Sequence, residues 1–368
     1  MTSYSFRILQ AQPLRIALTI GGIALCVVLM LFLLSVYQGV AEGSVEYIRY
    51  NQTDLWVLQG NATNILRGSS ILSTGHGNLL REIPGIQSVS PILFLLSTVK
   101  KGNQASTVYL TGYDVTTGIG SPPQLLEGRH VENDGEIVLD HSFAAKFRFN
   151  VGDKVTMRED TLRVMGISAR TNMFVIQYAF VTLRQAQSQI GYPGLVTCYL
   201  VKVEDPKSIA VVRERIREEL PGSEVYDHPE FLRNNIREMQ SGFLPLLYTI
   251  AAIGGIVLTT ILSLILSINI LERRKDFAVM KTLGSPRRFL RGLIFAQGFQ
   301  ISSGGCLAAL LLFFPIVRLI ERISPEVSTK TSLEQIAGVV LAVWAMSAFS
   351  SLLAVQRVRR IYSLEAFS

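Results

Sequence analysis

Histidine and cysteine, the residue types that most often bind metals or act as nucleophiles, are scattered through this sequence. The four histidines are His76, His130, His141 and His228, and the three cysteines are Cys26, Cys198 and Cys306. A zinc site is built from closely spaced pairs of such residues, and the sequence has no such pair. We therefore expect neither a metal site nor a catalytic residue in this chain.

The sequence also lacks a phosphate-binding loop. The pattern Gly-x-x-x-x-Gly-Lys-Ser/Thr, whose backbone amides hold the phosphates of a nucleotide, occurs nowhere in the 368 residues. A glycine-rich stretch at Ile301–Cys306 lies inside a long apolar run, where small residues let helices approach closely. We therefore expect the chain to hold no cofactor and to hydrolyse no ATP by itself.

The segment Leu271–Arg288, LERRKDFAVMKTLGSPRR, suits the binding of a partner protein. On a helix, Phe277, Met280 and Lys281 form one stripe, and Gly284 suits the helix end. A short helix with an apolar side and a basic stem can dock into a groove on another protein. The alternative is that the arginines only orient the chain in a membrane, while the apolar side rests on lipid.

Long stretches without charge dominate the composition. Hydrophobic residues make up 49 % of the chain and charged residues 17 %, whereas soluble domains carry about a quarter charged residues. Each stretch is long enough to cross a hydrocarbon layer about 30 Å thick. Four membrane helices are expected, within Ile16–Ala41, Met239–Leu271, Gly292–Val317 and Gln335–Gln356. Close helix packing is expected at their adjacent glycines, Gly21, Gly22, Gly254, Gly255, Gly304 and Gly305.

The basic residues are unevenly divided among the segments between these stretches. The N-terminal segment, the loop Glu272–Arg291 and the tail from Arg357 hold 12 Lys/Arg against 3 Asp/Glu, whereas Glu42–Glu238 holds 20 against 22. Excess Lys/Arg in short flanks marks the cytoplasmic side. We expect a protein of the cell (inner) membrane with both termini cytoplasmic and the large segment outside. The basic residues lack interleaved aromatics, which argues against nucleic acid.

The segment between the first two spans is expected to form an α+β domain. Helices are predicted at 77–82, 141–148 and 206–220, and strands at 54–59, 89–100, 107–113, 136–140, 154–158, 162–167 and 196–203. Glu82–Val89 resembles Glu219–Tyr226, because in both a helix stops at Pro-Gly and an extended stretch begins. This repeat indicates either two related βαβ-like units in one subdomain or a chance recurrence.

No strong helix breaker separates Phe231 from the second apolar stretch. The second membrane helix is therefore expected to begin well outside the bilayer, with Pro245 bending it near the boundary. Such a helical stalk would join the domain to the membrane mechanically.

Several of these segments together resemble one protein family. ERRKDFAVMKTLGSPRR, PLRIALTIGGIAL at the first span, REIPGIQSVSP, LEGRHVENDGEIVLDHSFAAKFRFNVGDKV with LRVMGI, and the tail VRRIYSLEAF occur in the order found in permease subunits of the FtsX/MacB superfamily, or type VII ABC systems. The chain departs from that pattern at Asp276, where Glu is usual, at Thr282, where Ala is favoured, at Pro286, and at Ser363, where the family has Pro.

The resemblance implies partners that composition does not reveal. Such permeases form a dimer with a second copy or a homologue and bind two cytoplasmic ATPase subunits, which hold the ATP and Mg²⁺. It also implies a coupling helix at Glu272–Leu283 and an outer segment with a strand-rich and a βαβ-type subdomain. The residues expected to couple the chain to the ATPase are Glu272, Arg273, Arg274, Asp276, Phe277, Met280, Leu283 and Gly284.

The expected fold is therefore an α-helical membrane protein with four transmembrane helices and a large α+β extracytoplasmic domain between the first two. The spans are placed at 16–38, 243–271, 289–318 and 334–356. Cytoplasmic parts are placed at 1–15, 272–288 and 357–368, and extracytoplasmic parts at 39–242 and 319–333. The span interiors contain no charged residue or histidine, which argues against a proton-coupled carrier.

Three functions fit this organisation. The first is ATPase-driven efflux of an amphiphile such as a drug, a haem-like molecule or a lipid. The second is release of lipoproteins from the membrane. The third, which is not transport, is regulation of a cell-envelope enzyme. A membrane-fusion adaptor or a substrate carrier is a further partner that the sequence leaves open.

Overall fold

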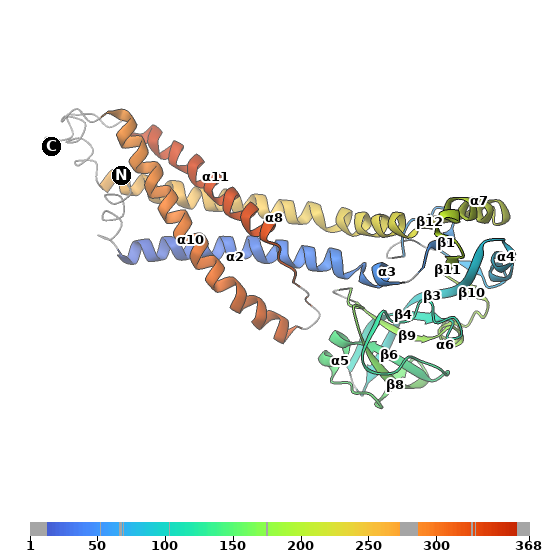
Figure 1. The fold of residues 1–368 in the computed structure, drawn as a ribbon. Helices are drawn as coiled ribbons and strands as arrows, with labels where there is room; N and C mark the ends of the chain where they lie inside the picture. The colour runs from blue at the N-terminus through green and yellow to red at the C-terminus, as the bar shows by residue number, and fades with distance from the viewer. Residues whose placement is uncertain are drawn as a thin grey trace. The chain divides into compact units, whose positions relative to one another are not determined.

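A computed structural model describes residues 13–51, 53–65, 68, 70–102, 104–173, 176–272, 286–324, 327 and 329–358 (Figure 1). The chain divides into two compact units. The helical unit contains Met1–Gln38, Leu244–Ile320 and Thr329–Ser368, and the α+β unit contains Gly39–Phe243 and Glu321–Ser328. Each unit has its own hydrophobic core, so we describe them separately.

Four long helices contribute to the helical unit. They are α2 (Pro13–Gly43), α8 (His228–Glu272), α10 (Arg287–Ile323) and α11 (Leu333–Val358). Among the described residues, three segments are long and apolar enough to cross a membrane: Ile16–Gly43, Arg291–Ile323 and Leu333–Leu353. A shorter apolar segment, Tyr248–Leu264, lies inside α8. The expected fold class, membrane helices with an α+β unit after the first of them, is confirmed.

The membrane helices pack through apolar side chains. Ile23 and Val27 of α2 are buried against Leu258 of α8, Ala309 of α10 and Val343 of α11. Other large apolar side chains on the same helices are exposed, such as Leu18 and Leu25 of α2. In a bilayer such side chains face lipid or another protein at no hydrophobic cost.

One half of the α+β unit, here called the open half, is a four-stranded antiparallel sheet with the order β12-β1-β11-β3. Helix α4 connects β1 to β3, which lie on either side of β11. Helix α7 connects β11 to β12, which lie on either side of β1. Each connection is a split βαβ unit, as in ferredoxin-like folds. The elements are β1 (Leu55–Gln59), α4 (His76–Glu82), β3 (Ile86–Lys101), β11 (Cys198–Val203), η1 (Pro206–Ser208), α7 (Ile209–Glu219) and β12 (Ser223–Asp227).

This topology confirms the two βαβ-like units that the sequence repeat indicated. Helix α4 is followed by Gly85 and helix α7 by Gly222, both with positive φ, and a strand begins directly after each. Glycine adopts this conformation without steric cost, which makes Pro-Gly an effective helix stop. The repeat is therefore a structural one.

The other half, here called the ring half, is a closed ring of six strands. β3 pairs with β4, β4 with β9, β9 with β6, β6 with β8, β8 with β7, and β7 again with β3. Alternate residues of all six strands fill its interior, including Val99, Leu110, Leu139, Val164 and Val181. Its further strands are β4 (Gln104–Tyr113), β6 (Glu136–Asp140), β7 (Lys154–Met157), β8 (Asp160–Ala169) and β9 (Gln177–Thr182).

The remaining elements are short. They are α3 (Glu46–Tyr50), β2 (Leu72–Ser73), β5 (Gln124–Gly128), α5 (His141–Phe147), α6 (Leu183–Ile190) and β10 (Leu195–Val196). Sequence analysis missed α3, β2, β5, β9 and α6. The run expected as one strand from Val196 is interrupted at Thr197, because its hydroxyl and its backbone amide bond to Phe94 and Ile92 of β3.

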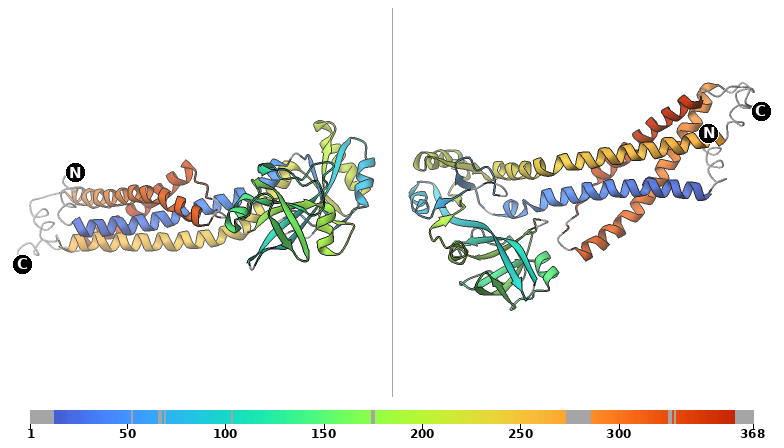
Figure 2. Two further views of the ribbon diagram at one scale, coloured as in Figure 1. Left: turned by 90° about the horizontal axis from the view of Figure 1, so that it is seen from below. Right: turned by 180° about the vertical axis from the view of Figure 1, so that it is seen from behind.

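Helix α8 begins at His228, three residues before the expected start of the stalk. Asp227 precedes it, and its Oδ1 accepts a hydrogen bond from the Glu230 amide at 2.7 Å, which caps the helix start. The helix then continues through Pro245 to Glu272, and both views in Figure 2 show its ribbon unbroken. One helix therefore contributes residues to both units.

Candidate functional site

The residues expected to bind an ATPase lie almost entirely outside the described residues. Glu272 is the last residue of α8. Arg273, Arg274, Asp276, Phe277, Met280, Leu283 and Gly284 fall in the segment 273–285, which the structure does not describe. Their role as a coupling helix stays a prediction.

Four of the six glycines expected at helix contacts lie close to side chains of other membrane helices. A Cβ on Gly305 would overlap Ile23 of α2, and one on Gly304 would lie 3.2 Å from Ile20 Cδ1. On α8, a Cβ on Gly255 would lie 2.7 Å from Met346 Cε, and one on Gly254 would lie 3.9 Å from Met30 Cε.

Gly21 and Gly22 differ from these four, since a Cβ on either residue would meet no atom within 4 Å among the described residues. They lie on α2 between the exposed side chains of Leu18 and Leu25. A packing role for these two glycines stays a prediction.

The first turns of α8 are embedded in the open half. Phe231 has no exposed surface and stacks on Trp56 of β1, with ring centroids 4.4 Å apart. Residues alternate along β1, so Trp56 and Leu58 face α8 while Leu55 and Val57 face α4 and α7. The sheet thus lies between α4 and α7 on one face and the start of α8 on the other.

The chain that follows α2 is embedded in the same core. Tyr47 of α3 is fully buried, and its hydroxyl donates to the Gly120 carbonyl at 2.8 Å. Its ring lies 4.8 Å from that of Tyr178 in β9. Burial raises the pKa of Tyr47 well above its ordinary value, so this phenol stays protonated. It therefore acts as a hydrogen-bond donor to the Gly120 carbonyl.

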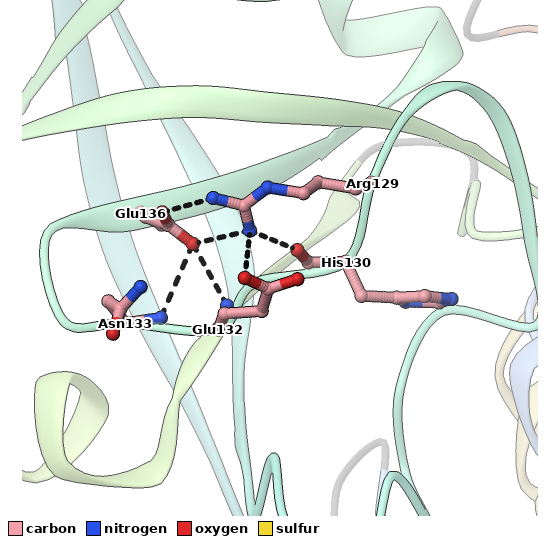
Figure 3. Close-up of polar contacts among 5 residues, drawn as sticks. All are labelled: Arg129, His130, Glu132, Asn133 and Glu136. Carbon is pink, nitrogen blue, oxygen red and sulfur yellow. Dashed lines mark hydrogen bonds and ion pairs between the residues drawn. The ribbon is translucent and has the colours of Figure 1, made fainter.

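A charged turn between β5 and β6 stands out in the ring half (Figure 3). Arg129 binds both carboxylate oxygens of Glu136, at 2.9 and 2.5 Å, and donates to the His130 carbonyl at 2.9 Å. The amides of Glu132 and Asn133 also donate to Glu136 Oε2, at 2.9 and 3.3 Å. The hydrogen bonds from Arg129 are the main reason that the pKa of Glu136 falls to about 2.

This pair has no free capacity for catalysis. Both carboxylate oxygens already accept hydrogen bonds from the turn that they close, and a carboxylate with so low a pKa is a poor proton acceptor near neutral pH. Arg129 and Glu136 lie within the segment LEGRHVENDGEIVLD, one of those that carry the family resemblance. The pair therefore fixes the turn at which the chain enters β6.

Asp140 is a buried carboxyl at the end of β6. Its Oδ1 accepts from the Ser142 amide at 2.8 Å and the Phe143 amide at 3.4 Å, and its Oδ2 accepts from Thr171 Oγ1 at 2.6 Å. Burial raises its pKa, and these hydrogen bonds oppose that effect. Asp140 thus caps α5 and ties it to the segment before β9.

Each unit contains a cavity lined by described residues. In the α+β unit, a polar hollow of about 710 Å³ is lined by hydroxyl and amide side chains together with His130 and Lys202, and its described lining contains no carboxylate. In the helical unit, a cavity of about 530 Å³ lies between α2, α8 and α11. Its described lining carries no charged side chain, and Gln335 is its most polar residue.

The buried polar residues of the α+β unit were not found from the sequence. Asn235 lies in the polar stretch FLRNNIREM, and nothing in that stretch shows which asparagine is buried. Asp140 had a local signal, because Asp before a short helix is a typical N-cap. Among the described residues, no group of three or more His, Cys, Asp or Glu is placed to hold a metal ion.

Comparison with known families agrees with this architecture. Residues 16–219 match the MacB-like periplasmic core domain, and residues 246–363 match the FtsX-like permease C-terminal family. The first match covers more than half of the chain and runs from the first membrane helix to the end of α7. The second covers the apolar part of α8 together with α10 and α11.

Individual relatives are distant. The lipoprotein-releasing system transmembrane protein LolE of Haemophilus influenzae is 24 % identical over 263 residues, and the match spans 63 % of this chain and 61 % of LolE. An uncharacterised ABC transporter permease of Mycobacterium tuberculosis is 22 % identical over 326 residues, 85 % of this chain and 86 % of that protein.

Among solved structures, the periplasmic region of MacB from Actinobacillus actinomycetemcomitans is similar, with a TM-score of 0.40 and 19 % identity over 50 % of this chain and 92 % of that one. The family matches do not depend on this structural likeness, since each rests on the sequence. The chain belongs to the ABC transporter permeases of the MacB/FtsX type, multi-pass membrane proteins with a periplasmic core domain.

Proposed function

We propose that this permease carries motion from cytoplasmic ATPase subunits to its periplasmic domain through helix α8. An ABC transporter permease works with an ATPase partner, and this sequence has no phosphate-binding loop of its own. The observation that supports the proposal is the continuity of α8. Phe231 near one end is buried in the periplasmic domain, and Leu258 further along is buried among the membrane helices.

Continuity matters because a helix is a rigid element. A displacement applied to one part of α8 is carried to its other parts, unless the helix bends or melts between them. The partner must also bind the two arrangements of the helix with different affinity, since equal affinity shifts no equilibrium. The ATP-bound and ATP-free states of the partner would supply that difference.

The coupling helix at Glu272–Leu283 would receive this motion. In the proposal the basic residues lie in the cytoplasm and Phe277, Met280 and Leu283 dock on the ATPase. The permease would act as a dimer, with a second copy or with a homologue. Gly21 and Gly22, which have open space beside them, suit an approach of the second permease.

We propose an amphiphile, such as a drug, a haem-like molecule or a lipid, as the substrate. The cavity of about 530 Å³ between α2, α8 and α11 supports this choice, because its uncharged lining suits the apolar part of such a molecule. The runner-up is release of lipoproteins, which the likeness to LolE favours. Regulation of a cell-envelope enzyme is a third candidate, without a specific observation in its favour.

The docking role is tested by replacing Phe277, Met280 and Leu283 together with Ser, in the permease purified with its ATPase in lipid nanodiscs. We expect normal membrane insertion and loss of the ATPase stimulation that the permease provides, because the apolar contacts are gone. Replacing Lys275, Ala278 and Thr282 with Ser is the matched control and should preserve stimulation. Unchanged stimulation in the first variant would refute the docking role.

The same preparation separates the two transport functions. ATPase activity is measured with a soluble fluorescent amphiphile and, separately, with a triacylated lipopeptide. Stimulation by the amphiphile alone supports efflux, whereas stimulation by the lipopeptide alone favours lipoprotein release. If neither molecule changes the activity, both transport assignments lose their support and regulation becomes the leading hypothesis.

A further inference from the structure

Helix α8 is joined to the sheet of the periplasmic domain by a buried polar side chain as well as by apolar packing. Asn235 has no exposed surface. Its Nδ2 donates to the Phe231 carbonyl one turn earlier at 2.8 Å, and its Oδ1 accepts from the Ile65 amide at 3.2 Å. The first bond fixes the side chain on α8, and the second connects it to the segment between β1 and β2.

Ile65 continues the connection towards the ring half. Its side chain is buried, and its carbonyl accepts a hydrogen bond from the Tyr109 hydroxyl of β4 at 2.5 Å. The Tyr109 ring stacks on Phe94 of β3 at 5.4 Å and meets Tyr178 of β9 edge-on at 5.4 Å. The backbone of Ile65 is thus held on both sides, by α8 through its amide and by β4 through its carbonyl.

A hydrogen bond constrains motion differently from the apolar contacts beside it. Stacked rings such as Trp56 and Phe231 can slide over one another while they stay buried, because dispersion and the hydrophobic effect have little directionality. A hydrogen bond that a buried backbone N–H donates to a side-chain amide oxygen has a narrow range of length and angle. Leaving that N–H unpaired is costly. Asn235 therefore resists sliding of α8 past the sheet more strongly than Phe231 does.

We infer that Asn235 is a positioning residue that, through Ile65 and Tyr109, makes the ring half follow the displacement of α8. This inference rests on the proposed function, because it presupposes that α8 moves when the ATPase binds nucleotide. It adds the residue at which movement of the helix becomes movement of the strands.

Two reporter positions separate movement of the helix from movement of the ring half. Arg237 lies on α8, and Arg184 lies on α6, whose Ala186 is buried in the core of the ring half. Both arginine side chains are exposed. Each is replaced in turn by an unnatural amino acid that carries a fluorescent donor, and an acceptor is attached to the lipids of the nanodisc. Energy transfer is measured for the complete permease–ATPase complex with and without a non-hydrolysable ATP analogue.

The expected result is a nucleotide-dependent change at both positions in the wild-type background. With Asn235→Leu, the change at Arg237 should persist, while the change at Arg184 falls about twofold or more, because the helix no longer draws the strands with it. Asn234→Leu makes the same chemical change at the neighbouring, half-buried position and should leave both signals as in the wild type.

Tyr109→Phe provides a second, milder variant, since it removes only the hydroxyl that binds Ile65. It should also reduce the change at Arg184, and it decides the question if Asn235→Leu does not fold. No change at Arg237 in the wild type would refute the proposed transmission through α8. Equal changes at Arg184 in the wild type and in both variants would overturn the role of Asn235 while leaving that transmission intact.

Discussion

The open half and the ring half of the periplasmic domain are closed in different ways. The open half has a free sheet edge at β12, and its sheet is covered on one face by α4 and α7 and on the other by residues of α3 and α8. The ring half has six strands in a closed circuit and a core of its own. Strand β3 belongs to both, with its first residues beside β11 and its last beside β7.

This difference indicates where movement enters the domain and how it spreads. Phe231 on α8 packs on Trp56 of the open half, whereas Tyr47 after α2 packs against Phe94 of the shared strand β3 and against Tyr178 of β9. Each of the six strands in the circuit of the ring half is hydrogen-bonded to a neighbour on both sides, so displacement of one strand also displaces its neighbours. We therefore expect the open half to deform and the ring half to move as a rigid body.

Phe231→Ala should have the largest effect. Removing a fully buried phenylalanine costs about 3–5 kcal/mol of unfolding free energy, and here it also removes the contact between α8 and Trp56. Phe143→Ala is the matched change in the ring half, at a residue that is 1 % exposed. Thermal unfolding should show similar losses of stability for both variants.

The coupling of the two variants should differ. At a temperature where both are folded, ATPase stimulation by substrate should fall in Phe231→Ala and persist in Phe143→Ala, because only Phe231 lies on α8. Phe231→Leu keeps most of the apolar contact and should recover much of the stimulation. An equal loss of stimulation in Phe143→Ala would show that the two halves are coupled to the ATPase equally.

Asp140→Ala should have a smaller effect, confined to the ring half. It removes the N-cap of α5, which typically costs about 1 kcal/mol and up to about 2, and it removes one of the two hydrogen-bond partners of the Thr171 hydroxyl, leaving Ser168. Asp140→Asn keeps an acceptor for the Ser142 amide and should be milder. In Asp140→Ala, hydrogen exchange of the α5 amides should be faster, and exchange of the α4 amides in the open half should be unchanged. An equal rise in both helices would show that the ring half does not keep its structure independently of the open half.

Sequence patterns predicted the elements whose signal is local. The membrane helices follow from long charge-free runs. The two Pro-Gly stops at Gly85 and Gly222 indicated either paired βαβ units or a chance recurrence, and the structure has the paired units. Helix α6 was missed because its sequence, LRQAQSQI, is polar and its start depends on the Thr182 side chain that caps it. Closure of the ring was also missed, since it depends on the pairing of the four-residue strand β7 with β3 about 55 residues earlier.

The functional residues also differ in whether a local sequence pattern marks them. The segment expected to carry the coupling residues has a local pattern of basic and apolar residues, so the sequence alone predicts a site there, and this stays a prediction. Asn235 has no such pattern, because its role depends on Ile65, 170 residues away along the chain. Contacts of this kind become visible only when the fold brings the two segments together.

Acid should produce the smallest of the effects, at the turn held by Arg129 and Glu136. The folded protein lowers the pKa of Glu136 from its ordinary value of 4.5 to about 2. The charged form is thus favoured by folding, so its contribution to stability is complete above pH 4.5 and is lost as the pH falls towards 2.

Glu136→Gln should remove this contribution at neutral pH, and the stability of that variant should depend less on pH between 4.5 and 2 than that of the wild type. Hydrogen exchange at the amides of Glu132 and Asn133, followed against pH in both proteins, measures the effect at the turn itself. Acid opening of the turn should leave the contact of Phe231 with Trp56 intact, because none of the hydrogen bonds that Glu136 accepts in the turn comes from α8. Simultaneous loss of both would show that the two halves unfold as one.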